Sequence, residues 1–509
     1  MTTPLPFELT GITLAPGRKR SQQLYLALRE LIISQPESGG SKLPATRELA
    51  AMLNISRNTA IIAYERLYAD GLLETRTGDG TYITLMHKAK SAHGTLPSLP
   101  PDAPLHDGMN LAIAARFNRH VVHTDQPRAF RIGLPALDCF PFETWSRLQN
   151  RFWRREPVAY MGYGDPAGDK QLRELIANYL RNARGLKCDP AQVLVTLGAQ
   201  QAIMVCAAML LKAGDEVVME NPCYWAAAGA FSCLGVHINP LGVDNEGMMT
   251  QGLAAIPRAK MAYVCPSCQY PLGVTMSLSR RLELLNWATE RQAWIIEDDY
   301  DGEYRYNGTP LMPLAALDES HRVMYIGSFS KVMYPGLRLG YLIAPPQLAD
   351  KLTLLRTLST RQPPMNDQRV MADFIAEGHF QPHIRKMRKV SRARRDALLT
   401  AWRTHLSHIG EMPEVSSGLQ VTVRLTSAEQ EQLLVAHALA ANIEITPLSS
   451  LWLPHATGDD NHYGLILGFA GISENDIMTA VRRLKAIWPS EEQMIAARQR
   501  GKPTCRGKA

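Results

Sequence analysis

The sequence predicts two folded units of different class: a small α+β winged helix near the N-terminus and a larger, doubly wound α/β domain after it. Three short amphipathic segments and a glycine-rich hairpin pattern within the first ninety residues predict the winged helix. Apolar strand patterns that alternate with helical patterns from about residue 131 to 487 predict the α/β domain. A length of 509 residues also exceeds what one ordinary hydrophobic core fills, so more than one domain is expected.

Residues 19–86 contain the elements of a winged helix-turn-helix, after an N-terminal tail at 1–18. "SQQLYLALRELII" and "ATRELAAML" have helical apolar spacing, and "RNTAIIAYERLYADG" predicts a third helix that ends at Gly71. Ser56 is a good N-cap for this third helix, and "LLETRTGDGTYI" predicts two short strands around a glycine turn. The residues expected to face inward from the first two helices are Leu24, Leu28, Leu31, Ile32, Leu49, Met52 and Leu53.

The polar residues of this unit suit a DNA-binding role. A winged helix places its third helix in a major groove, and its wing contacts the DNA backbone. Side chains at the N-terminal end of that helix reach base edges, while its free N–H groups attract phosphate. The alternative is a three-helix interaction module with ordinary surface arginines. The residues expected to contact double-stranded DNA are Arg47, Ser56, Arg57, Asn58, Thr59, Arg76 and Gly78.

The segments outside the two units are polar. Residues 87–130 are expected to form an extended linker, because "HKAKSAHGTLPSLPPDAPLHDG" is rich in Pro, Ser, Gly and His and has no apolar period. Residues 488–509 form a basic tail, and a second basic run at 384–395 is either a solvated helix face or a nucleic-acid patch. No apolar run is long enough to span a bilayer and the N-terminus has no signal pattern, so we expect a cytoplasmic protein with no membrane partner.

Strand ends in the α/β domain carry a combination of groups that one cofactor requires. Gly198 opens a helix after "VLVTL", Asp298 and Tyr300 follow "AWII", and Lys331 and Arg338 follow "VMYIG". Pyridoxal 5′-phosphate (PLP) needs a lysine for its Schiff base, a carboxylate for its pyridine nitrogen, and cations or helix N–H groups for its phosphate. A neighbouring positive charge also lowers the pKa of such a lysine and keeps its amine nucleophilic. The sequence therefore predicts a PLP site centred on Lys331.

The cysteines of the sequence do not predict disulfides, a zinc site or a redox site. The eight cysteines are irregularly spaced and do not suggest a disulfide framework. Cys265 and Cys268 match C-x-x-C, but without a second pair or nearby histidines they make a poor zinc site. Their place between an apolar strand and a turn, instead of at a helix start, also disfavours a redox role.

The chain resembles fold-type I aminotransferases and, more closely, the MocR-type regulators of the GntR superfamily. "LPATRELAAMLNISRNTAIIAYERLYADGLLETRTGDGTYI" follows the GntR pattern, with Ala45 where that pattern usually has a serine. "YGDPAGDKQLRELIANYL", "CDPAQVLVTLGAQQA", "IIEDDYDGEYRY" and "SFSKVMYPGLRLGYL" are similar to the aminotransferase motifs. The resemblance covers residue 19 to about 487. It implies a large doubly wound sheet domain, a smaller C-terminal α/β subdomain, and a head-to-tail homodimer.

The resemblance also implies a role for each matching residue of the cofactor site. Lys331 would form the internal aldimine, and Tyr300 would hydrogen-bond the phenolic oxygen of PLP. Asp298 would pair with the pyridine nitrogen, with Asp299 as its rival, because alternation places Asp298 on the same face as Tyr300. Tyr224 would stack on the cofactor ring. The phosphate contacts are expected from Ala199, Gln200, Ser328, Ser330 and Arg338, with Tyr163 reaching the phosphate of the partner subunit.

Two departures from the family pattern bear on function. Cys268 stands where "PSHQ" would have a histidine, and Ile466 stands where relatives that handle amino acids carry an arginine for the substrate carboxylate. An apolar side chain cannot make that charge-assisted pair. Either another arginine substitutes, with Arg361 as a candidate, or the effector is not an α-carboxylate.

The expected function is that of a PLP-dependent, DNA-binding transcriptional regulator. Its small-molecule effector would be PLP itself, as in control of vitamin B6 metabolism, or an amine or amino-acid-like ligand that reacts with PLP. Full transaminase turnover is not expected, because a substrate without an anchoring arginine is poorly oriented for proton transfer; a residual half-reaction is compatible with this reading. The alternative is a working aminotransferase with an accessory DNA-binding domain.

Overall fold

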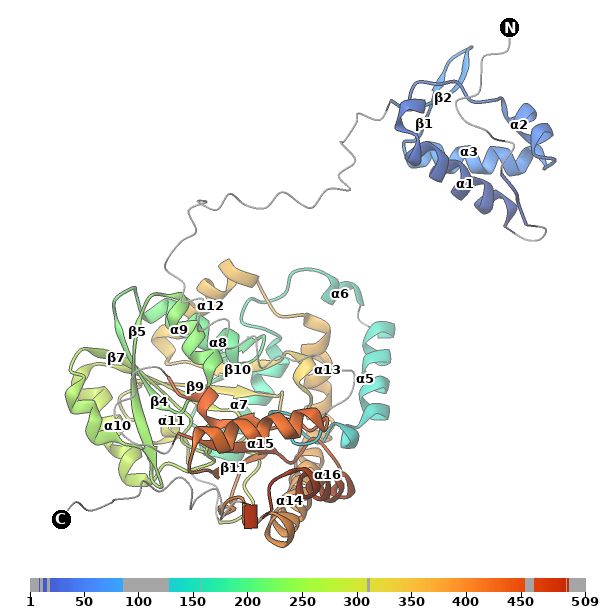
Figure 1. The fold of residues 1–509 in the computed structure, drawn as a ribbon. Helices are drawn as coiled ribbons and strands as arrows, with labels where there is room; N and C mark the ends of the chain where they lie inside the picture. Colours follow the sequence, from blue (N-terminus) through green and yellow to red (C-terminus); the bar gives the residue numbers. More distant parts are fainter. Residues whose placement is uncertain are drawn as a thin grey trace. The chain divides into compact units, whose positions relative to one another are not determined.

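The computed structural model of the chain describes residues 12–15, 19–85, 128–155, 157–308, 312–453 and 462–490, together with Leu9 and 492–493. The chain divides into two compact units, residues 1–105 and 106–509 (Figure 1). Most of the expected linker and of the two terminal tails lies outside the described residues. No helix in the described part of the chain is both long and apolar enough to cross a membrane.

The N-terminal unit is a winged helix. Its elements are α1 (Arg20–Ser34), α2 (Thr46–Met52), α3 (Arg57–Ala69), β1 (Leu73–Arg76) and β2 (Gly80–Ile83). β1 and β2 pair antiparallel around a turn in which Gly78 has a φ of 78°, so the glycine of the wing is conformationally required. Ser56 caps α3, because its Oγ accepts a hydrogen bond from the Thr59 N–H at 3.2 Å, as predicted.

The core of this unit differs from the prediction at one position. Leu24, Leu28 and Leu49 are fully buried, but Met52 is 42% exposed. The buried face of α2 is centred between Leu49, Ala50 and Leu53, and at about 100° per residue the Met52 side chain points away from that centre. Ala50 is buried in this helix in addition to Leu49.

The C-terminal unit is built on an eight-stranded mixed sheet with the order β3-β10-β9-β8-β7-β4-β5-β6. The strands are β3 (Val193–Thr196), β4 (Glu216–Asn221), β5 (His237–Asp244), β6 (Gly247–Met248), β7 (Ala259–Val264), β8 (Trp294–Asp299), β9 (Val323–Ser328) and β10 (Gly340–Ile343). β5, β4, β7, β8 and β9 run parallel to one another, whereas β6 is antiparallel to β5 and β10 is antiparallel to both β3 and β9. The carboxyl ends of β8 and β9 therefore lie side by side.

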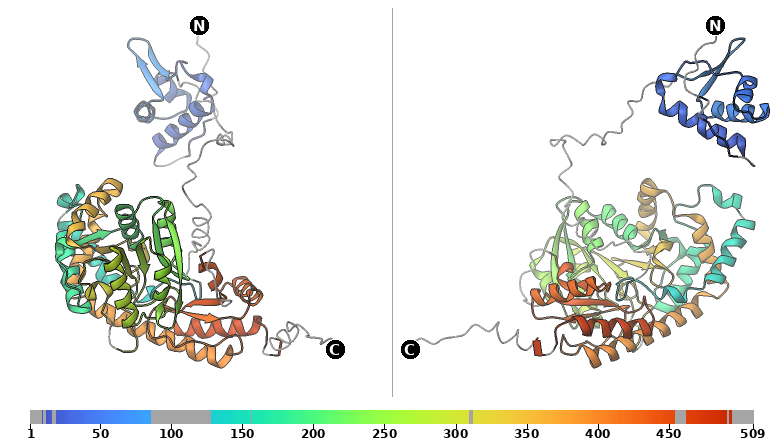
Figure 2. Two further views of the ribbon diagram at one scale, coloured as in Figure 1. Left: turned by 90° about the vertical axis from the view of Figure 1, so that its left-hand side faces the viewer. Right: turned by 45° about the vertical axis from the view of Figure 1, so that its right-hand side comes forward.

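Helices cover both faces of this sheet (Figure 2). Leu194 packs into one hydrophobic cluster with residues of α8 and α9, while Val193 and Val195 pack into another with residues of α7 and α13. Burial on both faces explains why these strands are continuously apolar in the sequence. The helices are α5 (Phe142–Arg155), α6 (Pro157–Met161), α7 (Lys170–Arg184), α8 (Ala199–Leu210), α9 (Trp225–Cys233), α10 (Leu278–Arg291), α11 (Leu314–Leu317), α12 (Pro346–Thr360) and α13 (Met365–Ala376).

A smaller C-terminal subdomain follows. It contains α14 (Phe380–His405), α15 (Ala428–Ala440), α16 (Glu474–Ile487) and a three-stranded sheet in the order β11 (Gln420–Arg424), β13 (Gly464–Gly468), β12 (Thr446–Pro447). The segment that begins at residue 128 is bound to this subdomain, because the Ala129 and Phe130 carbonyls accept hydrogen bonds from the N–H groups of Glu444 and Gly468 at 3.0 and 2.8 Å.

The basic run at 384–395 lies on α14 and is only partly a solvated face. Arg394 and Arg395 are buried, and their guanidinium groups donate to the carbonyls of Ala470 and Val415 at 2.6 and 2.7 Å. These two arginines therefore fix α14 against the rest of the subdomain. The other cations of the run are exposed: Arg385, Lys386, Arg388, Lys389 and Arg392.

Candidate cofactor and DNA-binding sites

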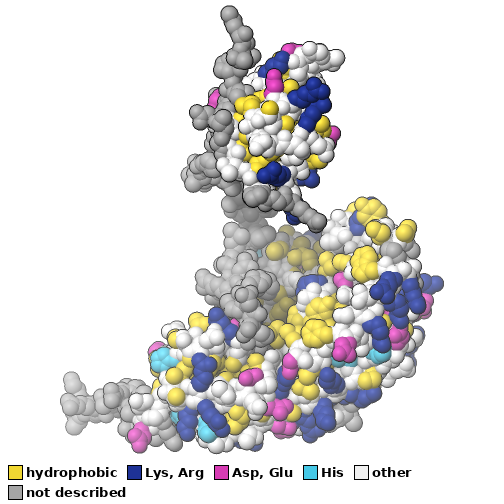
Figure 3. Space-filling view, turned by 90° about the vertical axis from the view of Figure 1, so that its right-hand side faces the viewer, with side chains coloured by type: hydrophobic (Ala, Val, Ile, Leu, Met, Phe, Trp, Pro, Cys, Tyr) yellow, Lys and Arg dark blue, Asp and Glu magenta, His cyan; other side chains and the backbone are white. Residues whose placement is uncertain are grey.

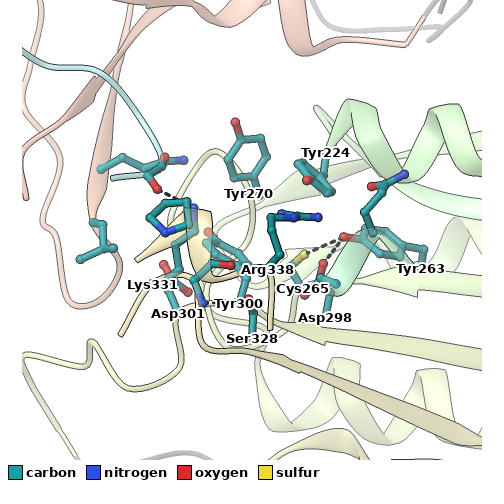
Figure 4. A pocket seen from close by; sticks show the side chains of 17 residues that line it. Tyr224, Tyr263, Cys265, Tyr270, Asp298, Tyr300, Asp301, Ser328, Lys331 and Arg338 are labelled. Carbon is teal, nitrogen blue, oxygen red and sulfur yellow. Dashed lines mark hydrogen bonds between the residues drawn. The ribbon is translucent and has the colours of Figure 1, made fainter. Parts of the chain in front are cut away.

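A cavity of about 180 Å³ opens where the carboxyl ends of β8 and β9 meet the N-terminus of α8 (Figure 4). Of the ten residues predicted to bind the cofactor, all except Tyr163 line this cavity. The structure thus brings together side chains that are up to 139 positions apart in the sequence, from Ala199 to Arg338. The nine lining residues of that set are Ala199, Gln200, Tyr224, Asp298, Tyr300, Ser328, Ser330, Lys331 and Arg338.

The two neighbouring aspartates at the end of β8 point to different surroundings. Asp298 lines the cavity, and its Oδ2 accepts a hydrogen bond from the Tyr263 hydroxyl at 2.6 Å, while its Oδ1 has no hydrogen-bond partner. Asp299 instead forms a buried ion pair with Arg184 and accepts a hydrogen bond from the Tyr325 hydroxyl. Burial raises the pKa of Asp298 to about 6, against the hydrogen bond from Tyr263 and the charge of Lys331.

Lys331 lies just past the end of β9 and faces Asp298 and Asp301. Its Nζ donates a hydrogen bond to the Gly133 carbonyl at 2.7 Å. Burial lowers the pKa of Lys331, while the charges of Asp301 and Asp298 act in the opposite direction. A Cβ at Gly133 would stand only 3.2 Å from Nζ, so glycine leaves the room that the amine occupies. A lowered pKa makes more of the free, nucleophilic amine available near neutral pH.

One end of the cavity suits a phosphate group. Gly198 (φ 89°) precedes α8 and turns the free N–H groups of this twelve-residue helix toward the cavity. The Arg338 guanidinium lies across from it and donates to the Leu197 carbonyl at 2.8 Å. A Cβ at Gly198 would come within 3.4 Å of the Arg338 Nη2 and narrow this space. Ser328 and Ser330 add hydroxyl groups at the same strand end.

Three tyrosine rings pack around the ring end of the cavity. The Tyr270 ring contacts the rings of Tyr224 and Tyr300 edge to face, with centroids 5.6 and 6.0 Å apart. The Tyr300 hydroxyl lies 3.8 Å from the Cys268 Sγ, and burial together with the charge of Asp298 raises the pKa of Tyr224 to about 12. Neutral phenols of this kind can hydrogen-bond or stack on an aromatic ligand without adding charge.

Sequence reasoning missed several residues of the cavity wall. Asp301 is 2% exposed, and its Oδ2 has no hydrogen-bond partner. Burial raises its pKa to about 7, against the charge of Lys331. Its position two residues after Asp299 could have identified Asp301 from the sequence. The other missed residues come from loops and strands that are distant in sequence, and no local pattern marks them. The missed lining residues are Gly133, Tyr263, Cys265, Tyr270, Asp301, Pro335, Leu419 and Gln420.

Tyr163 and Arg361 lie elsewhere on the unit. Tyr163 is 82% exposed, and the Arg361 guanidinium stands over its ring at 4.0 Å from the centroid. Neither residue lines the cavity of its own chain. An exposed tyrosine in this position remains free to contact a second subunit.

The cavity fits PLP. The unpartnered Asp298 Oδ1 suits a protonated pyridine nitrogen, because a buried carboxylate oxygen without a partner is unfavourable. The Lys331 amine suits the cofactor aldehyde, and the α8 N-terminus with Arg338 suits the phosphate. Bound in this way, the cofactor would supply an electrophilic carbon and an electron sink for reactions of primary amines.

The predicted DNA-contacting residues lie on the surface of the winged helix. Arg47, Arg57 and Asn58 are exposed, the latter two at the first turn of α3. Arg76 on the wing is also exposed, but its guanidinium contacts the Glu74 carboxylate at 2.9 Å and the Tyr82 ring at 4.1 Å. Ser56, Thr59 and Gly78 complete the predicted set at the α3 cap and the wing turn.

Comparison with known proteins identifies relatives for both units. Residues 20–83 match the family of bacterial regulatory proteins named gntR, and residues 137–457 match aminotransferase class I and II. The probable rhizopine catabolism regulatory protein MocR of Rhizobium meliloti is 36% identical over 91% of this chain and 93% of its own. The pyridoxine biosynthesis transcriptional regulator PdxR of Corynebacterium glutamicum is 29% identical over 89% of this chain and 93% of its own.

Solved structures give the same result for the larger unit. The crystal structure of Pyrococcus horikoshii kynurenine aminotransferase in complex with PMP matches with a TM-score of 0.67 at 27% identity. The match covers 77% of this chain and 95% of that one. The larger unit therefore has the fold-type I aminotransferase fold, and its cofactor is pyridoxal phosphate.

Proposed function

This chain belongs to the MocR-type family of GntR transcriptional regulators, and from that premise we propose that its effector domain senses PLP, or an amine that reacts with bound PLP, and passes the signal to the winged helix. The observation that carries the proposal is the presence in one chain of a complete winged helix and a cavity that fits PLP but has no arginine in the place of the carboxylate clamp. The DNA-binding domain would span 19–86, the linker 87–130 and the effector domain 131–487, with tails at 1–18 and 488–509.

In this proposal the cofactor contacts are divided among three regions of the cavity. Lys331 holds the cofactor covalently, and Asp298 keeps the pyridine nitrogen protonated. Tyr300 donates to the phenolic oxygen, and Tyr224 packs on the ring. The phosphate is held by Ala199, Gln200, Ser328, Ser330 and Arg338.

A homodimer would complete the site and present two winged helices to DNA. Apolar side chains are exposed on α6, α12 and the end of α5, among them Trp153 (56%), Leu358 (80%) and Val158 (83%). Figure 3 shows hydrophobic side chains on this side of the larger unit. Exposed apolar groups of this size support a subunit interface. Tyr163, next to these residues in the chain, would contact the phosphate of the partner's cofactor.

The substitution Lys331→Ala tests this function. Added PLP should give full-length wild-type protein a new absorbance band, and PLP or an amine should change its affinity for DNA fragments that it selects from a random pool. The variant should show neither effect, whereas Lys485→Ala, which removes an exposed lysine of α16, should behave as wild type. Unchanged regulation of DNA binding in Lys331→Ala would refute the proposal.

The alternative function is that of an aminotransferase with an accessory DNA-binding domain. The intact set of Lys331, Asp298 and Tyr300 favours it, because these groups also serve transamination. Formation of a keto acid from an amino acid by the PLP-loaded protein, at many turnovers per subunit, would support the alternative over a purely regulatory role.

A further inference from the structure

We propose that the effector is a primary amine that carries a second amino or hydroxyl group and no carboxylate, and that Asp301 binds this second group. The inference rests on the proposed function, since it names the ligand class of the same cavity. Three features of the cavity wall carry it: its cations, the sheet face that closes it, and its free acceptor groups.

The cavity has no cation to spare for a ligand carboxylate. Among the described residues that line it, the cationic side chains are Lys331 and Arg338. The proposed function commits Lys331 to the cofactor carbonyl. Arg338 lies at the phosphate end, beside Gly198 and bonded to the Leu197 carbonyl. A ligand carboxylate in this cavity would therefore be desolvated without a bidentate partner, which is strongly unfavourable.

The small sheet closes the cavity with neutral groups. Ile466 on β13 pairs directly with Thr422 on β11, so their side chains share one face of the sheet with Gln420. Gln420 lines the cavity, whereas Ile466 is fully buried in an apolar cluster that includes Leu448 and Leu451. The position from which an arginine would reach a carboxylate is thus filled by hydrocarbon. Arg361, the candidate substitute, stacks on the exposed Tyr163 instead of lining the cavity of its own chain.

The same wall of the cavity carries hydrogen-bond acceptors that could bind a donor group of the ligand. The Asp301 Oδ2 is buried beside Gly418, where a Cβ would stand 3.1 Å away. The donor near it is the Cys268 thiol, which hydrogen-bonds only weakly, so this oxygen can still accept from a stronger donor. The Gly133 carbonyl accepts from the Lys331 Nζ in this structure, and commitment of that amine to the cofactor would leave the carbonyl as a further acceptor. Figure 4 shows Asp301 beside Lys331 on this side of the cavity. An ammonium or hydroxyl group would satisfy Asp301, whereas a carboxylate would meet like charge.

Three probes of equal chain length test the inference: 1,4-diaminobutane, 4-amino-1-butanol and 4-aminobutanoate. Each presents a primary amine to react at the cofactor, and the group at the other end is an ammonium, a hydroxyl or a carboxylate. The symmetric diamine has two equivalent amines, so its apparent affinity is divided by two before comparison. Full-length PLP-loaded protein, freed of excess PLP by dialysis, is titrated with each probe while the absorbance of the bound cofactor is followed. We expect the diamine and the amino alcohol to bind at least about tenfold more tightly than 4-aminobutanoate.

Asp301→Asn assigns the effect to one carboxylate. On PLP-loaded protein it should lower the affinity for the diamine by about tenfold or more relative to that for 4-aminobutanoate, and any effect of the substitution on Lys331 itself cancels in this comparison of probes. Glu290→Gln, on the exposed surface of α10, is the matched control and should leave all three affinities unchanged. If Asp301→Asn does not fold, the order of the three probes on wild-type protein still decides the matter.

The outcomes separate the two proposals. If wild-type protein binds no PLP, both the proposed function and this inference are refuted. If PLP binds but 4-aminobutanoate is the tightest probe, or none of the three probes changes the spectrum, the inference alone is overturned. Equal loss of all three affinities in Asp301→Asn would overturn the role of Asp301 as the group that selects the ligand.

Discussion

Replacement of Asp301 by asparagine should stabilise the cofactor-free effector domain at neutral and alkaline pH, and the gain should fade in acid. The folded protein raises the pKa of this carboxyl from 3.8 to about 7, chiefly by burial, and this value already includes the opposing charge of Lys331. Between these two pH values the folded state binds more protons than the unfolded state, so wild-type stability falls as the pH rises. An asparagine amide at this position does not ionise, so the unfolding free energy of the variant does not fall in this way as the pH rises.

The size of the effect follows from the shift in pKa. A shift of roughly 3 units, at about 1.36 kcal/mol per unit, gives an upper limit of about 4 kcal/mol above pH 7. At pH 4 the folded carboxyl is protonated and the unfolded one is about 40% protonated, so the difference in unfolding free energy should shrink to less than about 1 kcal/mol. The variant should therefore gain most near pH 8.

Urea unfolding at several pH values between 4 and 8 measures this difference. Tryptophan fluorescence reports the larger unit alone, because all eight tryptophans of the chain lie after residue 105. Glu290→Gln on the surface of α10 should follow the wild-type curve within about 0.5 kcal/mol at every pH. A difference between Asp301→Asn and wild type that did not change with pH, or a less stable variant at pH 8, would refute the reasoning.

Three substitutions test other parts of the molecule. Arg57→Ala should reduce the preference of the protein for its DNA site in competition binding, because this side chain lies at the first turn of α3, and unchanged preference would exclude α3 as the reading helix. Arg76→Ala on the wing should weaken binding to all DNA and reduce the salt slope by about one unit, measured by titration at several salt concentrations. Arg184→Ala would leave Asp299 buried without its cation and should lower the unfolding free energy by about 3–5 kcal/mol in urea; a loss below 1 kcal/mol would contradict this account.

Local patterns predicted the secondary-structure elements, and the strand-end residues that they singled out line the cavity. Polar residues directly follow apolar strand patterns at Gly198 and at the ends of β8 and β9. Such a change from apolar to polar residues can be recognised within a few positions of the sequence. Period-two alternation also placed Asp298 on the face of the strand end that lines the cavity, whereas Asp299 is paired with Arg184 on the other side. These features depend on a few neighbouring residues.

Other features depend on contacts that no local pattern encodes. Gly133 lies in the segment before α5, and Gln420 lies on β11 of the small sheet. Both line the cavity beside strand-end residues that are distant from them in sequence. Arg394 and Arg395 look like part of a solvated basic run, yet carbonyl groups from residues far away in the sequence accept their hydrogen bonds. Met52 is three residues after Leu49, but burial of Ala50 turns the inner face of α2 away from it. Burial of such residues is decided by tertiary packing.

The hydrogen bond between the Lys331 amine and the Gly133 carbonyl has a thermodynamic consequence. The stretch from residue 128 to 133 is the first described part of the effector domain, and it is bonded both to the C-terminal subdomain through Phe130 and to this lysine through Gly133. The atom that holds Gly133 is the same atom that is proposed to hold the cofactor. If binding of the cofactor to Lys331 breaks this hydrogen bond and shifts residues 128–133, the two events are thermodynamically linked, and linkage is reciprocal. DNA binding that favours one position of residues 128–133 would then change the affinity for the cofactor by the same factor by which the cofactor changes the affinity for DNA.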